Sequence, residues 1–255
     1  MAEKKTHTMD IVLRIFKILW ASFWAGLAML LVFIPIVVSA WLSSTGNLAF
    51  TISKAWAWIM LKVTGVRSEI RGRGKIRPGQ SYVIISNHQS HFDILALVMR
   101  LGIQFRWIIK KELRAIPLFG FALYKSKNIF IDRTDRDKAV QSIREGIRRL
   151  PPGVSVLFFA EGTRSPNGAI QPFKKGGFTT AVESDLPILP VTVNGSRKVL
   201  PKGTLAFKRG SIEVVVGDPV DTRGYTHDTI ENLIAVTRNT IIANFNPNYP
   251  EGRMS

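Results

Sequence analysis

The feature that most constrains this chain is an uncharged stretch that runs from Ile18 to Ser53. Its first part, residues 18–42, is mostly apolar. As a straight α-helix with a rise of ~1.5 Å per residue it would be about 37 Å long, which exceeds the ~30 Å hydrocarbon core of a bilayer. We therefore expect this segment to attach the protein to a membrane. A secretory signal explains it less well, because the run is longer than the apolar region of a signal peptide and no small-residue cleavage site follows it.

A turn and a second apolar stretch follow this run. Pro35 is expected to interrupt the first helix, and residues 43–46 (Ser-Ser-Thr-Gly) predict a turn. Residues 47–66 are apolar except for two lysines that share one edge of a helix, as in an amphipathic helix at a membrane interface. We expect a membrane-associated helical hairpin over residues 1–66 that enters the bilayer and returns on the same side. Two complete crossings are the alternative.

The charge of the chain indicates where it lies and what it binds. It has 35 Lys and Arg against 18 Asp and Glu, a formal net charge of +17, which favours an anionic partner. Basic residues precede the apolar run, so the positive-inside rule predicts a protein of the cytoplasmic membrane whose residues 67–255 lie on the cytoplasmic face. Nucleic-acid motifs are absent, and the aromatic residues concentrate in the apolar segment, so we expect no nucleic-acid partner. The lack of cysteine excludes a thiol nucleophile and cysteine-bound metals.

The rest of the chain alternates short β-branched runs with helical patterns. The predicted strands are residues 82–86, 105–109, 129–131, 154–159, 188–193 and 212–216, and the predicted helices are residues 91–101, 135–150, 177–184 and 226–245. This alternation predicts an α/β fold with a largely parallel sheet flanked by helices, made mixed by a hairpin between residues 205–207 and 212–216. Residues 67–78 predict a linker or an edge strand. We divide the chain into the hairpin and a second domain of residues 67–255, in which residues 246–255 predict a disordered tail.

Ligands of open α/β sheets bind at the carboxyl ends of the strands, so the segments that follow the strands are the candidates for chemistry. Residues 87–93 (Asn-His-Gln-Ser-His-Phe-Asp) follow the first of these strands. His88 and Asp93 are five residues apart, so they can meet only if the chain bends between them. His88 would then serve as a general base whose ring Asp93 orients. An exposed turn, or a metal site of His88, His91 and Asp93, is the alternative from these residues alone.

Three other strand ends carry cations. In residues 161–165 (Glu-Gly-Thr-Arg-Ser) a glycine between an acid and a hydroxyl allows the backbone to approach an anion, and Arg164 can hold a phosphate with two hydrogen bonds. Arg133 and Lys110 end two further strands. Solvated charge clusters are the alternative for each. Taken together, the strand ends predict a site in which a general base acts beside a bound phosphate.

Four blocks of the sequence resemble, in order and spacing, the motifs of the glycerolipid acyltransferase family, in particular the bacterial lysophosphatidic acid acyltransferases. They are residues 87–93 (NHQSHFD, for N-H-x4-D), 127–133 (KNIFIDR), 159–165 (FAEGTRS, for F-P-E-G-T-R-S) and 189–195 (LPVTVNG). The resemblance covers about residues 67–220. Lys127 stands where the family's second motif usually has glycine, and Ala160 where the third usually has proline.

The resemblance implies transfer of a fatty acyl group from acyl-CoA or acyl carrier protein to the sn-2 hydroxyl of lysophosphatidic acid, which gives phosphatidic acid. His88 would be the general base and Asp93 the residue that orients it. The substrate phosphate would lie among Lys110, Arg133, Glu161, Gly162, Thr163 and Arg164. The expected partners are lysophosphatidic acid, the acyl donor and membrane lipid, without a metal or further cofactor. The alternatives are an acyltransferase for another lysophospholipid or an amine-bearing lipid, and a non-enzymatic protein that binds anionic lipid at the membrane surface.

Overall fold

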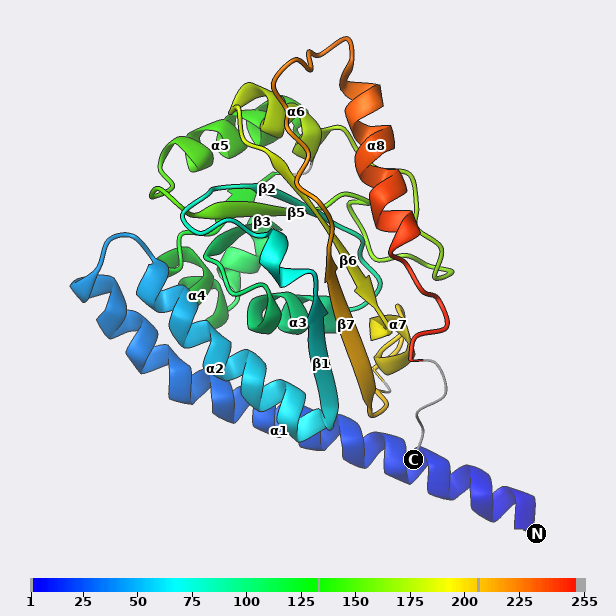
Figure 1. Ribbon diagram of the computed structural model, residues 1–255. Helices are drawn as coiled ribbons and strands as arrows, with labels where there is room; N and C mark the ends of the chain where they lie inside the picture. Colours follow the sequence, from blue (N-terminus) through cyan, green and yellow to red (C-terminus); the bar gives the residue numbers. More distant parts are fainter. Residues whose placement is uncertain (1, 133, 206, 251–255) are drawn as a thin grey trace.

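A seven-stranded sheet forms the centre of the molecule (Figure 1). The computed structural model describes residues 2–132, 134–205 and 207–250. The strands are β1 (Val66–Arg71), β2 (Val83–Ser86), β3 (Phe105–Lys110), β4 (Ile129–Ile131), β5 (Ser155–Phe159), β6 (Ile188–Asn194) and β7 (Gly210–Val216). Their order across the sheet is β1-β7-β6-β2-β5-β3-β4, and all neighbours are parallel except β6 and β7. The predicted α/β fold with a mixed, largely parallel sheet is confirmed.

Helices cover both faces of this sheet. They are α1 (Ala2–Leu42), α2 (Asn47–Thr64), α3 (Phe92–Arg100), α4 (Phe119–Lys125), α5 (Arg136–Arg148), α6 (Gly176–Glu183), α7 (Ser196–Val199) and α8 (Ile230–Ala243), with 3-10 turns η1 (Arg73–Lys75) and η2 (Lys111–Ala115). Helices α5, α6 and α8 lie on one face, and α2 and α3 lie on the other (Figure 1). In β2, Val83 and Ile85 face the first group while Ile84 faces the second. Strands buried on both faces explain the nearly continuous apolar runs in the sequence.

The sheet is mixed for a different reason from the predicted one. Strand β7 pairs antiparallel with β6 on one side and parallel with β1 on the other. Both edges of β7 are therefore occupied, and residues 205 and 207 lie outside the strands, with Leu205 71% exposed. Residue 206 is outside the described part of the chain. The segment predicted as a linker or an edge strand, residues 67–78, includes all of β1 except Val66, and β1 is an edge strand.

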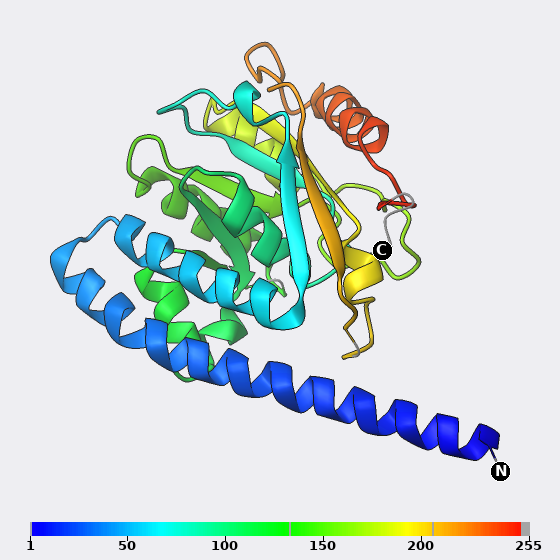
Figure 2. The ribbon, with the colours of Figure 1, turned by 60° about the horizontal axis from the view of Figure 1, so that its bottom comes forward.

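The first helix does not break at Pro35, contrary to expectation. Proline removes one backbone donor and disfavours a helix interior, yet α1 continues through it to Leu42. Val32 and Ile36, on either side of the proline, are buried against Ala49 of α2 and Ala122 of α4. This packing holds the turns on both sides of the proline in helical form. The predicted turn at residues 43–46 is present, and α2 returns along α1 (Figures 1 and 2).

Helix α2 packs into the same core as the sheet. Phe50 and Leu61 of α2 are buried with Phe105 of β3, and the rings of Phe50 and Phe105 meet edge to face at 4.9 Å. The division of the chain at residue 66 stays a prediction. At the other end of the chain, the Asn246 N–H donates to Asn194 Oδ1 (3.0 Å). Residues 246–250 of the predicted tail are thus described, and residues 251–255 lie outside the described part.

A buried arginine joins the turn between α1 and α2 to the sheet. Arg106 of β3 is fully buried, and its guanidinium donates to Thr45 O (3.1 Å), Asn47 Oδ1 (2.6 Å) and Gln104 Oε1 (3.2 Å). Burial lowers the pKa of Arg106 to about 10, which leaves the side chain charged at neutral pH. The hairpin is therefore fixed to the sheet by a buried charge whose partners are mostly neutral oxygens.

We predict that Arg106→Ala destabilises the protein by about 3 kcal/mol, because the change leaves a cavity in the core and unpaired, partly buried oxygens on the turn. Thermal unfolding of the full chain in detergent, followed by circular dichroism, measures the effect. The control is Arg148→Ala on the exposed face of α5, which should change stability by less than about 0.5 kcal/mol. Equal unfolding temperatures for the two variants would contradict this role of Arg106.

Candidate active site

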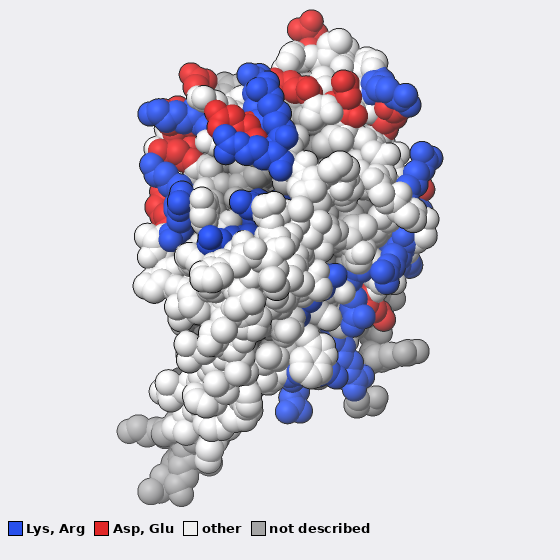
Figure 3. Space-filling view, turned by 90° about the vertical axis from the view of Figure 1, so that its left-hand side faces the viewer, with Lys and Arg blue, Asp and Glu red and all other residues white. Residues whose placement is uncertain are grey.

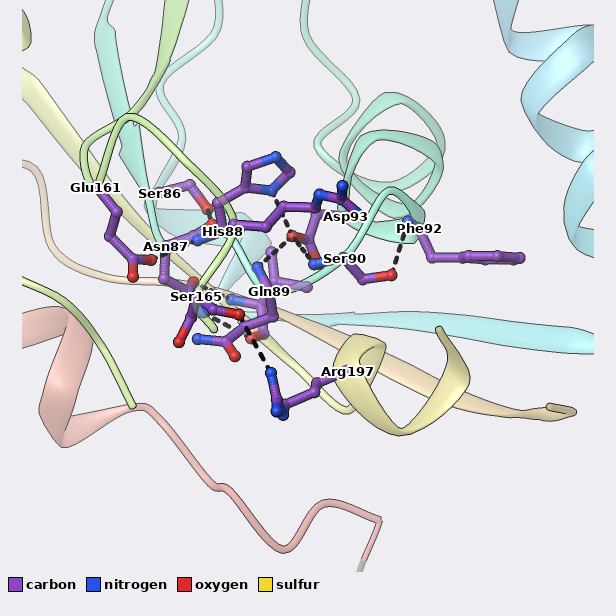
Figure 4. Close-up of polar contacts among 12 residues, drawn as sticks. Ser86, Asn87, His88, Gln89, Ser90, Phe92, Asp93, Glu161, Ser165 and Arg197 are labelled. Atoms are coloured by element: carbon purple, nitrogen blue, oxygen red, sulfur yellow. Dashed lines mark hydrogen bonds and ion pairs between the residues drawn. The ribbon is translucent and has the colours of Figure 1, made fainter. Parts of the chain in front are cut away.

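The chain bends sharply between the end of β2 and the first turn of α3. His88 Nδ1 lies 2.8 Å from Asp93 Oδ2, and the same oxygen accepts hydrogen bonds from the backbone N–H groups of Gln89 (2.7 Å) and Ser90 (2.9 Å) (Figure 4). This is the bend that the five-residue spacing requires. Asn87 extends the sheet beyond β2, because its side-chain amide exchanges two hydrogen bonds with the backbone of Val193 in β6 (2.8 and 3.0 Å).

The His88 ring is fixed in both position and plane. Asp93 is fully buried, and the ring of His88 stacks on Phe159 with 3.7 Å between centroids and 11° between planes. The His88 side chain is 13% exposed. Within the described residues, no hydrogen bond engages its Nε2 atom. Asp93 therefore fixes Nδ1, and Nε2 is the nitrogen that can exchange a proton with a substrate.

The segment after β5 holds the backbone of His88 from two sides. Glu161 Oε1 accepts from the His88 N–H (2.7 Å), and the Ser165 N–H donates to the His88 carbonyl (2.8 Å). The second oxygen of Glu161 accepts from the Gln171 N–H (2.9 Å). Burial raises the pKa of Glu161, and these two hydrogen bonds oppose the rise. Both carboxylate oxygens of Glu161 thus accept hydrogen bonds from backbone N–H groups, and its place among the phosphate-binding residues stays a prediction.

Gly162 and Thr163 form the tip of the same loop. Gly162 has a φ of +72°, and a Cβ there would lie 2.9 Å from Cε of Lys174, so glycine permits both the turn and the close approach of the lysine. The Thr163 side chain is exposed, and its Oγ1 accepts from Lys202 Nζ at 3.3 Å. Lys202 Nζ also donates to the carbonyl of Arg164 at 2.8 Å. Lys174 and Lys202 therefore lie beside this turn, whose Thr163 side chain is exposed to solvent.

The side chains of His91 and Arg164 lie close enough to interact electrostatically. The pKa of His91 is lowered, first by desolvation among the surrounding loops and then by the positive charge of Arg164. His88 contributes to the same effect. Arg164 directly precedes Ser165, whose N–H donates to the His88 carbonyl, and its role in binding a phosphate stays a prediction. Among the described residues, no group of three His, Asp or Glu side chains is arranged to hold a metal ion.

Lys110 lies farther along the same edge of the sheet. The registers Trp107↔Leu157 and Leu157↔Ile84 place Lys110 level with Asn87, two strands and roughly 10 Å away. Its side chain is 52% exposed, with Nζ 4.0 Å from Glu112. Arg133 lies outside the described residues.

Arg197 is a component of this site that sequence reasoning did not single out. It belongs to α7, which follows β6, and its guanidinium donates to the carbonyls of Ser165 (3.2 Å) and Pro166 (3.0 Å). A Cβ on Gly168 would lie 2.9 Å from Cδ of Arg197, so the loop closes tightly over the arginine. Its position after a predicted strand is the one sign in the sequence that Arg197 could belong to the site. The sequence does not show which backbone carbonyls its guanidinium contacts.

Comparison with known proteins identifies the family. A family model described as acyltransferase matches residues 67–194. The chain belongs to the acyltransferase family. An uncharacterized acyltransferase of Schizosaccharomyces pombe is 32% identical over 191 residues, which cover 74% of this chain and 68% of that protein. Human 1-acyl-sn-glycerol-3-phosphate acyltransferase alpha is 35% identical over 190 residues, which cover 74% of this chain and 67% of that protein.

A solved structure supports the fold. The crystal structure of the 1-acyl-sn-glycerophosphate (LPA) acyltransferase PlsC from Thermotoga maritima superimposes with a TM-score of 0.79. The match covers 91% of this chain and 95% of that one, at 23% sequence identity. The shared architecture therefore includes most of the acyltransferase described here.

We predict that Arg197→Gln lowers kcat by roughly 10- to 100-fold with little change in KM, because the loop that holds His88 shifts. Stability should fall by no more than about 1 kcal/mol, the usual contribution of such hydrogen bonds. Lys198→Gln is the matched control, since Lys198 on the same helix donates to Asn248 O (2.6 Å) instead. Arg197→Lys should restore part of the rate. An unchanged kcat in Arg197→Gln would show that the loop does not need this contact.

Proposed function

We propose that this acyltransferase transfers a fatty acyl group from acyl-CoA or acyl carrier protein to the sn-2 hydroxyl of lysophosphatidic acid, which gives phosphatidic acid. The observation that carries the proposal is the His88–Asp93 pair at the carboxyl edge of the sheet, with the loop of residues 161–165, which includes Arg164, bonded to the His88 backbone. The name of the human relative supports the choice of acceptor. The protein needs no cofactor beyond its acyl donor in this proposal.

In the proposed mechanism, Nε2 of His88 accepts the proton of the acceptor hydroxyl. Asp93 stabilises the imidazolium that forms and keeps the Nδ1 proton directed at itself. The alkoxide attacks the thioester carbonyl, and the tetrahedral intermediate collapses with loss of the thiolate. His88 then returns its proton to the thiolate. Direct attack suits a chain that has no cysteine to carry the acyl group.

The acceptor phosphate is proposed to bind Arg164, with the backbone of Gly162 and Thr163 beside it and Lys110 and Arg133 along the edge. A guanidinium can donate two parallel hydrogen bonds to a phosphate. Glu161 contributes to this set indirectly, because its carboxylate orders the loop and holds the His88 N–H.

The membrane supplies the acceptor in this proposal. The helix Ile11–Leu42 is long and apolar enough to cross a bilayer, and only 22% of its most apolar 18-residue segment is buried inside the protein. Figure 3, which views the left-hand side of Figure 1, shows a broad surface without charged side chains, bordered by lysine and arginine with some Asp and Glu among them. We place residues 67–255 on the cytoplasmic face, because Arg14 and Lys17 precede the most apolar part of α1 and α2 leads back to the sheet.

We predict that His88→Ala lowers acyl transfer by roughly 10³-fold or more and Asp93→Asn by a comparable factor, because each removes part of the base. The assay measures transfer from labelled acyl-CoA to lysophosphatidic acid in mixed micelles, with folding checked by thermal unfolding. His227→Ala is the control, since His227 is exposed beside Glu183. Full activity in His88→Ala would end the proposal. If wild type gives no product, acyl carrier protein replaces CoA as the donor.

We predict that Arg164→Gln raises KM for lysophosphatidic acid by roughly 10- to 100-fold, the loss expected for hydrogen bonds to a charged group. The same variant should act nearly as wild type on a monoacylglycerol, which lacks the phosphate. Initial rates over a panel of acceptors, including other lysophospholipids and amine-bearing lipids, measure this difference. If lysophosphatidic acid is the poorest acceptor of the panel, the phosphate assignment is wrong.

A further inference from the structure

A second exposed apolar surface lies beside α1. Ile116, which follows η2, and Phe121 and Tyr124 of α4 are 44%, 40% and 44% exposed. These three side chains are called the α4 patch below. They belong to the long connection between β3 and β4, which begins at Lys110, one of the proposed phosphate-binding residues.

The α4 patch continues the exposed apolar face of α1. Phe121 contacts Phe33 of α1, with 5.8 Å between ring centroids, while Ala122 is buried against Val32 and Ile36. The neighbours of Phe33 on α1 include Leu30 and Ile34, which are 56% and 68% exposed. Figure 2 shows α4 lying alongside this part of α1. The two helices therefore present one apolar surface.

The connection that carries the patch is held in a fixed and strained conformation. Leu118 and Lys127, at the two ends of α4, have φ angles of +58° and +59°, which non-glycine residues rarely adopt. Asn128 fastens the end of α4, since its amide donates to Leu123 O (2.9 Å) and accepts from the Trp107 N–H (2.9 Å). Such strain persists where the surroundings impose it, and it concentrates at functional positions.

Cations border the aromatic side chains of the patch. The Arg114 guanidinium lies 4.3 Å from the centroid of the Tyr124 ring, and Lys125 Nζ lies 5.2 Å from that of Phe121. Residues 110–127 contain five basic residues and one acidic residue. Aromatic rings with basic side chains beside them are typical of the boundary between lipid headgroups and acyl chains, where anionic lipid attracts the cations. This charge favours an anionic bilayer over a second copy of this basic chain.

We propose that the α4 patch is a second membrane contact, which enters the headgroup boundary of the same anionic bilayer that holds α1. The contact places the carboxyl end of β3, with Lys110, at the lipid surface, where the phosphate of a lysolipid lies. The inference rests on the membrane association given under Proposed function.

The absence of cysteine makes a direct test simple, because single cysteines can be labelled without background. An environment-sensitive fluorophore is attached to the single cysteine of the full-chain variants Phe121→Cys and Tyr124→Cys. Each labelled protein is then reconstituted in vesicles of phosphatidylcholine and phosphatidylglycerol. Phe23→Cys on α1, at a side chain 62% exposed, is the lipid reference, and Val236→Cys on α8, at a side chain 45% exposed, is the aqueous control. Nitroxide attached to lipid should quench the fluorescence of the probe at positions 121 and 124 several-fold more than at position 236. Aqueous iodide should quench the probe at position 236 more than at positions 121 and 124.

The outcomes separate this inference from the proposed function. Lipid quenching at position 23 with aqueous quenching at 121 and 124 overturns the inference and leaves the membrane association intact. Aqueous quenching at all four positions overturns both.

Kinetics give an independent measurement. The double variant Phe121→Ser, Tyr124→Ser should raise the apparent KM for lysophosphatidic acid in vesicles several-fold and leave the rate with a short-chain, monomeric acceptor unchanged. Val236→Ser is the control and should change neither value. An unchanged KM in vesicles, or an equal loss with both acceptors, overturns the inference.

Discussion

The buried carboxylate of Asp93 is the interaction on which the site depends. One of its oxygens accepts hydrogen bonds from the backbone of Gln89 and Ser90 and faces His88 Nδ1, so a single group bends the chain and orients the ring. Burial of a carboxylate is costly unless donors replace the lost hydration, and all of these donors meet Oδ2, while Oδ1 is buried without a hydrogen bond among the described residues. The loop after β2 therefore has little freedom, and the imidazole is oriented before any substrate arrives.

The neighbouring loops are also fixed by hydrogen bonds to one another. Glu161 and Ser165 hold the two backbone groups of His88, and Arg197 holds the carbonyl of Ser165. Three successive strands of the parallel part of the sheet, β5, β2 and β6, thus deliver loops that brace one another. The proposed chemistry depends on these contacts, because His88 can act as a general base only while it stays within hydrogen-bond distance of the acceptor hydroxyl.

The helical hairpin and the candidate active site share one framework in this acyltransferase. Arg106 fixes the turn of the helical hairpin to β3, and α2 packs directly on the sheet. The orientation of α1 is therefore coupled to the edge that carries His88. Under the proposed function, this coupling lets the membrane determine the direction from which the acceptor hydroxyl reaches His88.

The local sequence pattern predicts much of the fold and part of the candidate site. Apolar runs predicted six of the described strands, β2 to β7, within two residues, and the uncharged stretch predicted the C-terminal part of α1. The spacing of His88 and Asp93 predicted their bend. These features depend on neighbours in the chain. Tertiary structure decided the rest. Helix α1 continues through the exposed Pro35, and the residues on either side of it, Val32 and Ile36, pack against α2 and α4. Strand β7 pairs with β1 as well as with β6, and Glu161 accepts from the distant His88 N–H and from Gln171 of its own loop. A one-dimensional pattern states which residues are apolar or charged, but only folding determines which distant groups compete for the same edge, cavity or hydrogen bond.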